Sequence, residues 1–252
     1  MDDGAVRVLT WNVQGARGLD VARAAAVIGA AAPDVVALQE VQRRQAVALS
    51  RALSVRSRRW AFKHWPVVAP AEGLAVLSRH PLLDTASFPL RRRPFWDWRR
   101  RIGLDVVVGI GDRRVGLLDV HLSAHDVADR RRHEAVVALG RTGGRDPAPL
   151  IVGDLNDLPD AGAHAAFVAE GWIDCWRAVH GDGPPGSGAT NWTSGPRVGR
   201  PPTQRLDYVL APPGSTVRQC DVVEPAPLDE LATLSDHLPL VATVELPPGP
   251  DG

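Results

Sequence analysis

The 252-residue sequence contains few of the features that mark disulfide-stapled, zinc-binding or membrane-spanning proteins. Its two cysteines, Cys175 and Cys220, are far apart and have no neighbouring histidine or further cysteine, which argues against a disulfide framework or a zinc site. No run of apolar residues is long enough to span a membrane, and the first residues do not resemble a signal peptide. We therefore expect inert, buried thiols in a cytoplasmic protein without stable membrane anchoring.

Neither positive nor negative charge is in excess. The 29 basic residues balance the 29 acidic ones, which argues against a protein that coats nucleic acid by net charge alone but leaves a local basic patch possible. The apolar share of 44% and the charged share of 23% are typical of globular proteins. We expect one monomeric domain over residues 1–252, with residues 247–252 as a frayed tail.

Short β-rich runs recur along the chain and alternate only in part with helical patterns. The predicted strands are Val6–Trp11, Val35–Leu38, Leu74–Ser78, Ile102–Ile110, Val115–His121, Leu150–Val152, Leu206–Leu210 and Leu238–Leu246. The predicted helices are Leu19–Ala32, Gln42–Leu53, Asp126–Leu139 and Ala161–Glu170, with Asp126 and Asp160 as N-caps. Three of the strands follow one another without a helix, which favours packed antiparallel or mixed sheets in an α/β or α+β fold. Two Gly- and Pro-rich segments, 180–203 and 211–216, are predicted to be surface loops.

Polar side chains of the kind that bind metals or move protons follow several of these apolar strands. Strand ends meet at one edge of a sheet, so such side chains are expected to converge there. The six segments are Thr10-Trp11-Asn12-Val13-Gln14-Gly15, Ala37-Leu38-Gln39-Glu40-Val41, Asp119-Val120-His121-Leu122, Gly153-Asp154-Leu155-Asn156-Asp157, Arg205-Leu206-Asp207-Tyr208-Val209 and Ser235-Asp236-His237-Leu238-Pro239.

Each segment also has an ordinary structural interpretation when it is taken singly. Glu40 could be a solvated carboxylate that opens the next helix, and Asn12 could cap a turn. The Gly153–Asn156 segment could be only a turn after a buried strand. His121 could be a hydrogen-bonded core histidine. The order and number of the segments are therefore more informative than any one of them.

Taken together and in this order, the six segments resemble the motif series of the endonuclease/exonuclease/phosphatase superfamily. That superfamily includes DNase I-like nucleases, abasic-site endonucleases, neutral sphingomyelinases and inositol-polyphosphate phosphatases. The resemblance runs from Leu9 to Leu240, nearly the whole chain. It implies a DNase I-like fold, a four-layer α/β/β/α sandwich of two packed mixed sheets.

The resemblance also implies a metal site. Glu40 matches the main metal carboxylate, supported by Asn12 and Asp236. A phosphodiester is anionic, so its hydrolysis needs a cation on a non-bridging oxygen as well as a positioned nucleophile. Hard oxygen ligands without cysteine suit Mg²⁺, or Mn²⁺, better than zinc.

Five further residues match catalytic positions of the superfamily. His237 matches the catalytic histidine and Asp207 the carboxylate that orients it. Asp154 and Asn156 match the pair that holds the attacking water and a phosphate oxygen, and His121 matches a histidine that donates to the phosphate. Whether Asp154 or His237 takes the proton from the water is open at this point.

The sequence departs from the pattern of the superfamily in one respect that concerns the substrate. Abasic-site endonucleases carry an active-site tyrosine between the metal carboxylate and the Gly-Asp turn, whereas the only tyrosine here is Tyr208. That weakens a DNA-repair assignment. His121 is more similar to the branches that include DNase I and the sphingomyelinases.

The segment from Arg91 to Arg101 interleaves six arginines with three aromatic residues. We expect Trp98, Arg99 and Arg101 to bind substrate beside the site, because arginines suit phosphates and aromatics suit unstacked bases. An anionic lipid surface, or a solvated arginine face over packed tryptophans, would fit the same residues. Arg131 and Arg132 could also face the substrate, although charged residues on a helix are more often simply solvated.

The sequence therefore predicts a Mg²⁺-dependent phosphoric ester hydrolase. The preferred interpretation is a phosphodiesterase with nuclease-like activity on DNA or RNA. A phosphatase or a sphingomyelinase-like lipid phosphodiesterase is the enzymatic alternative. A catalytically inactive binding module is the alternative of another class, although Glu40, Asp154, Asp207 and His237 are all present.

Overall fold

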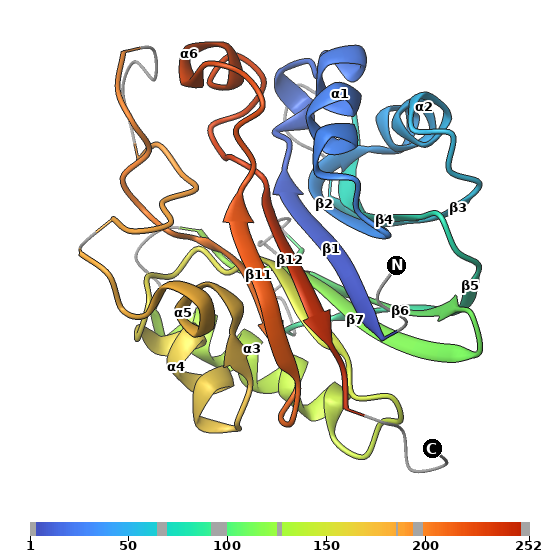
Figure 1. Cartoon of the computed structure of the whole chain (residues 1–252), viewed down its shortest axis with the longest axis vertical. Helices are drawn as coiled ribbons and strands as arrows, with labels where there is room; N and C mark the ends of the chain where they lie inside the picture. The colour runs from blue at the N-terminus through green and yellow to red at the C-terminus, as the bar shows by residue number, and fades with distance from the viewer. Residues whose placement is uncertain are drawn as a thin grey trace.

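The computed structural model describes residues 4–64, 70–91, 100–124, 128–184, 186–193 and 199–247, which form two packed β-sheets with helices outside them (Figure 1). In spatial order the first sheet contains β11 (Thr216–Val222), β12 (Leu240–Glu245), β1 (Ala5–Asn12), β2 (Val35–Gln42), β4 (Glu72–Ser78) and β3 (Ser57–His64). The second contains β5 (Leu82–Pro89), β6 (Ile102–Ile110), β7 (Arg113–His121), β8 (Leu150–Asp154), β10 (Asp207–Ala211) and β9 (Ile173–Asp174). Both sheets are mixed, as predicted, since β1 runs parallel to β2 and β7 to β8 while the other pairs are antiparallel.

The side chains of β1 alternate between two hydrophobic cores, one on each face of the strand. Val6 and Val8 point into the core between the sheets, while Leu9 and Trp11 point outward into a second core beneath the helices of the first sheet. Each fully buried aliphatic side chain of this kind contributes about 1.5–3 kcal/mol. A third core lies between the second sheet and its helices and contains Phe167. The arrangement is the predicted four-layer α/β/β/α sandwich.

Six short helices accompany the sheets in the described part of the chain. They are α1 (Val21–Ala31), α2 (Arg43–Ala52), α3 (Ala128–Thr142), α4 (Gly162–Ala169), α5 (Cys175–His180) and α6 (Leu228–Leu231). The α1 and α2 helices pack on the first sheet, and α3 and α4 pack on the second. Within the described part of the chain, no helix is long and apolar enough to cross a membrane. Both cysteines are buried and free, as expected.

The predicted N-cap at Asp160 is wrong, and the one at Asp126 lies outside the described residues. Helix α4 begins after Ala161, and its early backbone N–H at Ala163 donates to Asp157 instead (2.8 Å). Asp160 has a positive φ of 63°, and its carboxylate accepts from the Arg177 guanidinium (2.7 Å). Asp157 can cap the helix although it lies earlier in the chain than Asp160, because the turn between Asp157 and Ala163 folds back over the start of α4.

The strands that were not predicted from the sequence lie at the edges of the two sheets. These are β3 and β11 in the first sheet and β5 and β9 in the second. Edge strands are exposed on one side, so their polar residues interrupt the apolar pattern on which strand prediction depends. In β3 the exposed residues include Arg58 and Arg59, and in β11 they include Arg218.

Candidate active site

A pocket of about 800 Å³ opens at the edge of the sandwich where strand ends from both sheets meet. Strand register places three predicted residues in a row across the second sheet, because Asp154 pairs with His121 on one side and Asp207 on the other. His237 reaches the row from the loop before β12. The prediction that all these residues end their strands is wrong for Asp207 and His237. Asp207 begins β10 and His237 precedes β12, and both reach the same edge because their strands are antiparallel to their neighbours.

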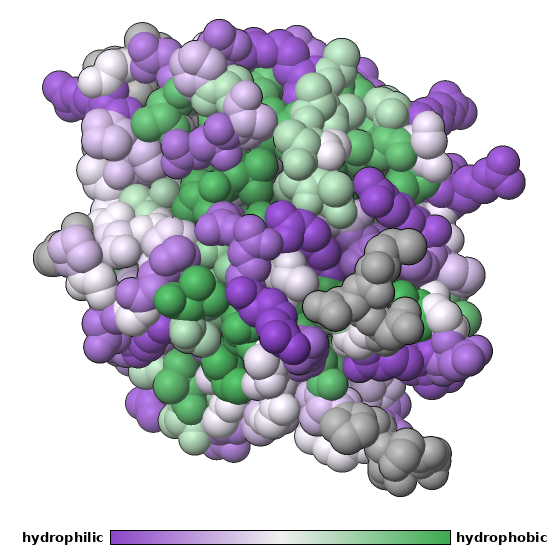
Figure 2. All heavy atoms as spheres, in the orientation of Figure 1, coloured by the Kyte–Doolittle hydropathy of each residue, from purple (hydrophilic) through white to green (hydrophobic). Residues whose placement is uncertain are grey.

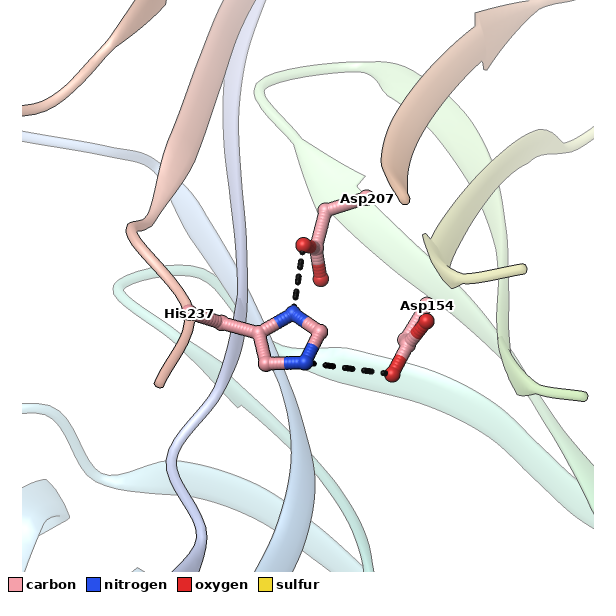
Figure 3. A group of neighbouring side chains, drawn as sticks. All are labelled: Asp154, Asp207 and His237. Atoms are coloured by element: carbon pink, nitrogen blue, oxygen red, sulfur yellow. Dashed lines mark hydrogen bonds and ion pairs between the residues drawn. The ribbon is translucent and has the colours of Figure 1, made fainter. Parts of the chain in front are cut away.

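His237 lies between two carboxylates (Figure 3). Its Nδ1 is 2.7 Å from Asp207 Oδ2, and its Nε2 is 3.8 Å from Asp154 Oδ2. Burial alone would lower the pKa of His237, but the charges of Asp207 and Asp154 and the hydrogen bond to Asp207 outweigh it and raise the pKa to about 10. The imidazole is therefore cationic at neutral pH, with Nε2–H directed toward Asp154.

Asp207 is held by a residue from the segment predicted to be a surface loop. Thr190 Oγ1 donates to Asp207 Oδ2 (2.6 Å) and also accepts from the Asp207 backbone N–H (3.2 Å). Residues 189–192 are buried, so the prediction of a surface loop over 180–203 is wrong for them. The Gly- and Pro-rich composition concealed a packed support for the site.

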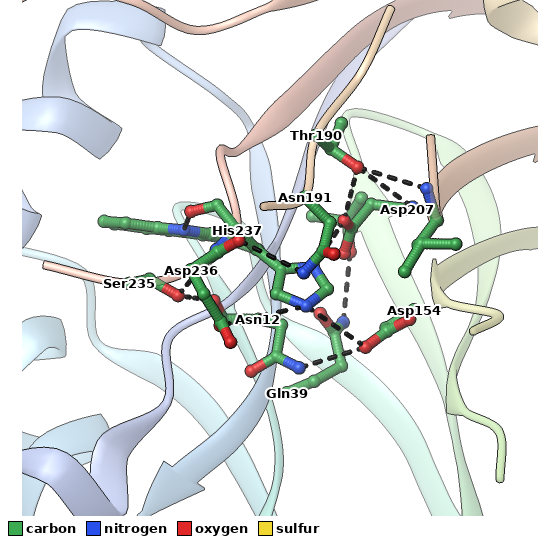
Figure 4. A network of polar contacts seen from close by, with 12 residues as sticks. Asn12, Gln39, Asp154, Thr190, Asn191, Asp207, Ser235, Asp236 and His237 are labelled. Carbon is green, nitrogen blue, oxygen red and sulfur yellow. Dashed lines mark hydrogen bonds and ion pairs between the residues drawn. The ribbon is translucent and has the colours of Figure 1, made fainter. Parts of the chain in front are cut away.

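The backbone around His237 is fixed by side chains from distant parts of the chain (Figure 4). Trp11 Nε1 donates to the His237 carbonyl oxygen (2.8 Å), and Ser235 Oγ donates to the Asn12 carbonyl oxygen (2.6 Å). Asn191 Nδ2 donates to the Asp236 carbonyl oxygen (3.1 Å). These bonds preorganise the imidazole, because they tie its loop to β1 and to residues 190–192.

Asp154 and Asn156 form a tight turn after β8. Asp154 Oδ2 accepts from Asn12 Nδ2 (3.0 Å), and its Oδ1 accepts from the Asn156 N–H (2.8 Å). Burial raises the pKa of Asp154 to about 6 against the opposing effect of His237. Gly153 has a φ of 131°, and a Cβ there would lie 1.9 Å from the Val120 carbonyl oxygen, so only glycine fits. Asn156 Nδ2 donates to the Leu122 carbonyl oxygen (3.1 Å), which orients its side chain.

Glu40 lies at a distortion of β2. Its φ is 54°, and the pairing of β2 with β4 shifts register between Leu38 and Val41. This irregularity turns the carboxylate into the pocket, where its side chain is 28% exposed and Oε1 lies 3.9 Å from His121 Nε2. Bulges often re-aim a side chain in this way beside a functional site.

His121 is buried against Lys63, a residue that the sequence analysis did not select. Lys63 Nζ lies 3.0 Å from His121 Nδ1. Burial lowers the pKa of Lys63 to about 7, helped by the nearby Arg101 charge, and burial together with Lys63 and Arg101 lowers the pKa of His121 well below its usual value. His121 is thus neutral at pH 7, and with Nδ1 accepting from Lys63 its Nε2 carries the hydrogen that faces Glu40 and Asp154.

The residues around Glu40 fit a hard divalent cation. Glu40 offers a carboxylate and Asn12 an amide oxygen in the same pocket as Asp236, and both cysteines are buried elsewhere. A tighter group, Asp154, Asp207 and His237, has ligand atoms within 4.8 Å of one another. Asp207 is fully buried and already bonded to His237, so this group is better described as a hydrogen-bonded chain than as a metal cage.

Asp236 reaches the pocket from the residue before His237. Its Oδ2 accepts from Gln14 Nε2 (2.5 Å), and its Oδ1 lies 3.9 Å from His237 Nε2. Gln14, which follows Asn12, is a further pocket residue that the sequence analysis did not select.

The predicted substrate-binding segment is described only at its ends. Arg101 lines the pocket, Arg91 pairs with Glu134 (3.1 Å), and Trp98 and Arg99 lie outside the described residues. Of the two helical arginines, Arg131 lines the pocket and pairs with Asp157 (3.3 Å). Arg132 is exposed.

Known proteins share this architecture. The model of the Endonuclease/Exonuclease/phosphatase family matches residues 9–237. A structure of an endonuclease/exonuclease/phosphatase from Beutenbergia cavernae is 26% identical, with a TM-score of 0.75, and covers 96% of this chain and 72% of its own. The human Nocturnin catalytic domain with bound sulfate is 20% identical (TM-score 0.69; 95% and 94% covered), and D. rerio TDP2 in complex with single-strand DNA product is 19% identical (TM-score 0.71; 95% and 98% covered). No curated protein matches the sequence.

Proposed function

Because the chain belongs to the endonuclease/exonuclease/phosphatase family, we propose that it is a Mg²⁺-dependent phosphodiesterase with nuclease-like activity. The observation that carries the proposal is the position of the His237 ring between Asp207 and Asp154, in the same pocket as Glu40. The D. rerio TDP2 structure, which holds a single-strand DNA product on the same fold, supports a nucleic-acid substrate.

Glu40 and Asn12, with Asp236 beside them, are the residues that would hold the cation. When bound, Mg²⁺ supplies positive charge to a non-bridging phosphate oxygen. The protein's own part is to direct the Glu40 carboxylate and the Asn12 amide oxygen to that position, and to hold positively charged side chains beside it. Arg101 and Lys63 line the same pocket and add further positive charge for an anionic substrate.

The protonation states favour Asp154 as the group that accepts the proton of the attacking water. His237, with a pKa raised to about 10, already carries its proton at neutral pH and can donate from Nε2 to a phosphate oxygen. Asp154, with a pKa raised to about 6, is ionised at pH 7 yet basic enough to accept a proton. Asp207 acts as a positioning residue, because it holds the imidazole in one orientation and favours its cationic form.

His121 and Asn156 complete the proposed contacts with the phosphate. Neutral His121 directs Nε2–H into the pocket, as a donor to a phosphate oxygen or to the departing oxygen. Asn156, fixed by Leu122, lies beside Asp154 to orient the water or the phosphate. All of these donors are positioned before substrate arrives, which is the arrangement that stabilises a developing charge at low reorganisation cost.

The proposal is tested with purified full-length protein and four substrates in Mg²⁺, Mn²⁺ or EDTA. The substrates are plasmid DNA, single-stranded RNA, bis-p-nitrophenyl phosphate and sphingomyelin vesicles. We expect hydrolysis of the small diester and at least one nucleic acid in Mg²⁺ and none in EDTA. Hydrolysis of sphingomyelin in preference to nucleic acid would replace the nuclease with a lipid phosphodiesterase. Full activity in EDTA would contradict the metal-dependent chemistry.

A further inference from the structure

One long stretch of the chain carries basic residues and no acidic ones, although the two kinds balance over the whole sequence. Residues 41–71 contain six arginines, the only lysine and no aspartate or glutamate. The lysine, Lys63, is buried in the candidate active site. The six arginines are exposed on α2, on the edge strand β3 and on the connection between them, and we call them the arginine face: Arg43, Arg44, Arg51, Arg56, Arg58 and Arg59.

The arginine face differs from other surface arginines in its pairing. Arg23, Arg177 and Arg218 each form an ion pair with a carboxylate at 2.6–3.6 Å. Among the described residues, no carboxylate lies within ion-pair distance of an arginine of the arginine face. Its charge is therefore directed to solvent and remains available to an anionic ligand.

The arginine face contains a groove. Arg43, Ala46 and Val47 of α2 and Arg58, Arg59 and Trp60 of β3 line a hollow of about 390 Å³. The Trp60 ring is fixed by a hydrogen bond from Nε1 to the Val41 carbonyl oxygen (2.9 Å). Phe62, 36% exposed, packs at a tilt against it with ring centroids 6.3 Å apart. Alternate residues of β3 thus present an arginine and two aromatic rings on one side of the strand.

Both walls of the groove belong to elements that also lead to the candidate active site. Helix α2 starts at Arg43, directly after the strand that carries Glu40. Strand β3 ends at Lys63 and His64, which line the active-site pocket. Its eight residues span about 26 Å at the usual rise per residue. Figure 2 shows hydrophilic side chains projecting from the edge of the molecule where Figure 1 places α2 and β3.

We propose that the arginine face binds a single-stranded polynucleotide and leads it along β3 into the active site. The proposal rests on the proposed function and names its substrate class. Unpaired arginines in a row match a sugar–phosphate backbone, and the exposed ring of Phe62 offers a stacking surface for an unpaired base. A groove beside a strand fits a linear polyanion better than a flat membrane.

Charge on β3 has a second physical effect, because arginines on an edge strand discourage pairing with other chains. That effect accounts for Arg58 and Arg59, which lie on the edge strand. It does not account for Arg43, Arg44 and Arg51, which lie on a helix. The experiment separates the two roles.

The test compares two triple variants with equal loss of charge. The first is Arg43→Gln, Arg58→Gln and Arg59→Gln in the groove, and the matched control is Arg79→Gln, Arg114→Gln and Arg218→Gln, all exposed outside the arginine face. Binding of a fluorescent 12-nucleotide oligo(dT) is followed by anisotropy in EDTA across 50–200 mM KCl, and bis-p-nitrophenyl phosphate hydrolysis is measured in Mg²⁺. Loss of three phosphate contacts should lower the slope of log affinity against log salt by about 2 and weaken binding at least about tenfold.

We expect this loss only in the groove variant, with hydrolysis of the small diester unchanged in both. An unchanged salt slope, an equal loss in the control, or preference of the wild type for phosphatidylglycerol vesicles over the oligonucleotide would overturn the proposal. So would a groove variant that aggregates while its monomeric fraction keeps the wild-type slope. If the triple variant does not fold, Arg58→Gln alone should lower the slope by about 0.7, and no change would count against the proposal. A wild type that binds oligo(dT) but hydrolyses no diester would instead contradict the proposed function.

Discussion

Asp207 Oδ2 accepts two short hydrogen bonds at once, one from His237 Nδ1 (2.7 Å) and one from Thr190 Oγ1 (2.6 Å). Asp207 is fully buried, and the cationic imidazole compensates its charge. The contact between Asp207 and His237 therefore fixes the orientation of the His237 ring and also favours its cationic form.

Replacing the charge of Asp207 should lower the pKa of His237. In Asp207→Asn the main attraction that raises this pKa from 6.5 to about 10 is lost, so the imidazole becomes neutral near pH 7. We expect diester hydrolysis at pH 7.5 to fall about 10²-fold or more, the usual effect of a positioned acid–base group. An NMR titration of the His237 ring measures the pKa directly. The exposed Asp160→Asn is the control and should leave that pKa unchanged.

The raised pKa of His237 also determines how the stability of the folded protein changes with pH. Since the folded-state pKa lies above the unfolded value, this group stabilises the protein fully below pH 6.5 and loses its contribution as the pH rises through about 10. Urea unfolding of the wild type should therefore show stability falling across that window. The fall should be smaller in Asp207→Asn.

Lys63 should determine the tautomer of His121. Its Nζ lies 3.0 Å from Nδ1, and a hydrogen bond donated by Nζ leaves the ring hydrogen on Nε2. In Lys63→Met the donor is lost, and we expect roughly tenfold slower hydrolysis together with a change in the ¹⁵N shifts of the His121 ring. Lys63→Arg should restore part of both. Slower hydrolysis with unchanged ring shifts would mean that Lys63 acts on the substrate and not through His121.

Asp174 should make folding sensitive to acid. Burial opposes ionisation, but hydrogen bonds and charge from His164 and Arg205 prevail and lower the pKa of Asp174. A lowered pKa means that this stabilisation is present above the unfolded value of 3.8 and is lost as the pH falls through the folded value. Asp174→Asn leaves the Arg205 guanidinium buried without its partner charge, so we expect a loss of about 3–5 kcal/mol at pH 7 in denaturant unfolding. Equal stability of the variant and the wild type at pH 7 would contradict this role.

Gly153 should tolerate no side chain. Gly153→Ala adds a Cβ that would overlap the Val120 carbonyl oxygen at a φ of 131°, and we expect it to cost about 3 kcal/mol or more. Gly140→Ala in α3 is the matched control, since its Cβ would meet nothing within 4 Å and alanine favours a helix. Thermal unfolding of both variants checks the contrast. A Gly153→Ala variant as stable as the wild type would show that the turn can be rebuilt without glycine.

The central strands could be predicted from the sequence because both of their faces are buried. The runs that became β1, β2, β7 and β8 are mainly apolar, and the polar residues at their ends marked the edge where the site lies. The edge strands could not be predicted in the same way, since solvent on one side allows residues such as Arg58 to interrupt the pattern.

The supporting residues of the site were also beyond sequence reasoning. Lys63 lies on an unpredicted edge strand, and Thr190 lies in a segment whose glycines and prolines indicated a loop. Their importance comes from long-range contacts with His121 and Asp207, which no local pattern encodes. The scarcity of lysine was the only available signal for Lys63, because a single lysine among 28 arginines stands out.

The most direct test of the account is the turnover of His237→Ala on bis-p-nitrophenyl phosphate under saturating Mg²⁺. Circular dichroism first establishes that the variant is folded. The account predicts that turnover falls by roughly 10²-fold or more, because the variant lacks the cationic donor between Asp154 and Asp207. Turnover that stays within a few-fold of the wild type would contradict the assignment of the active site.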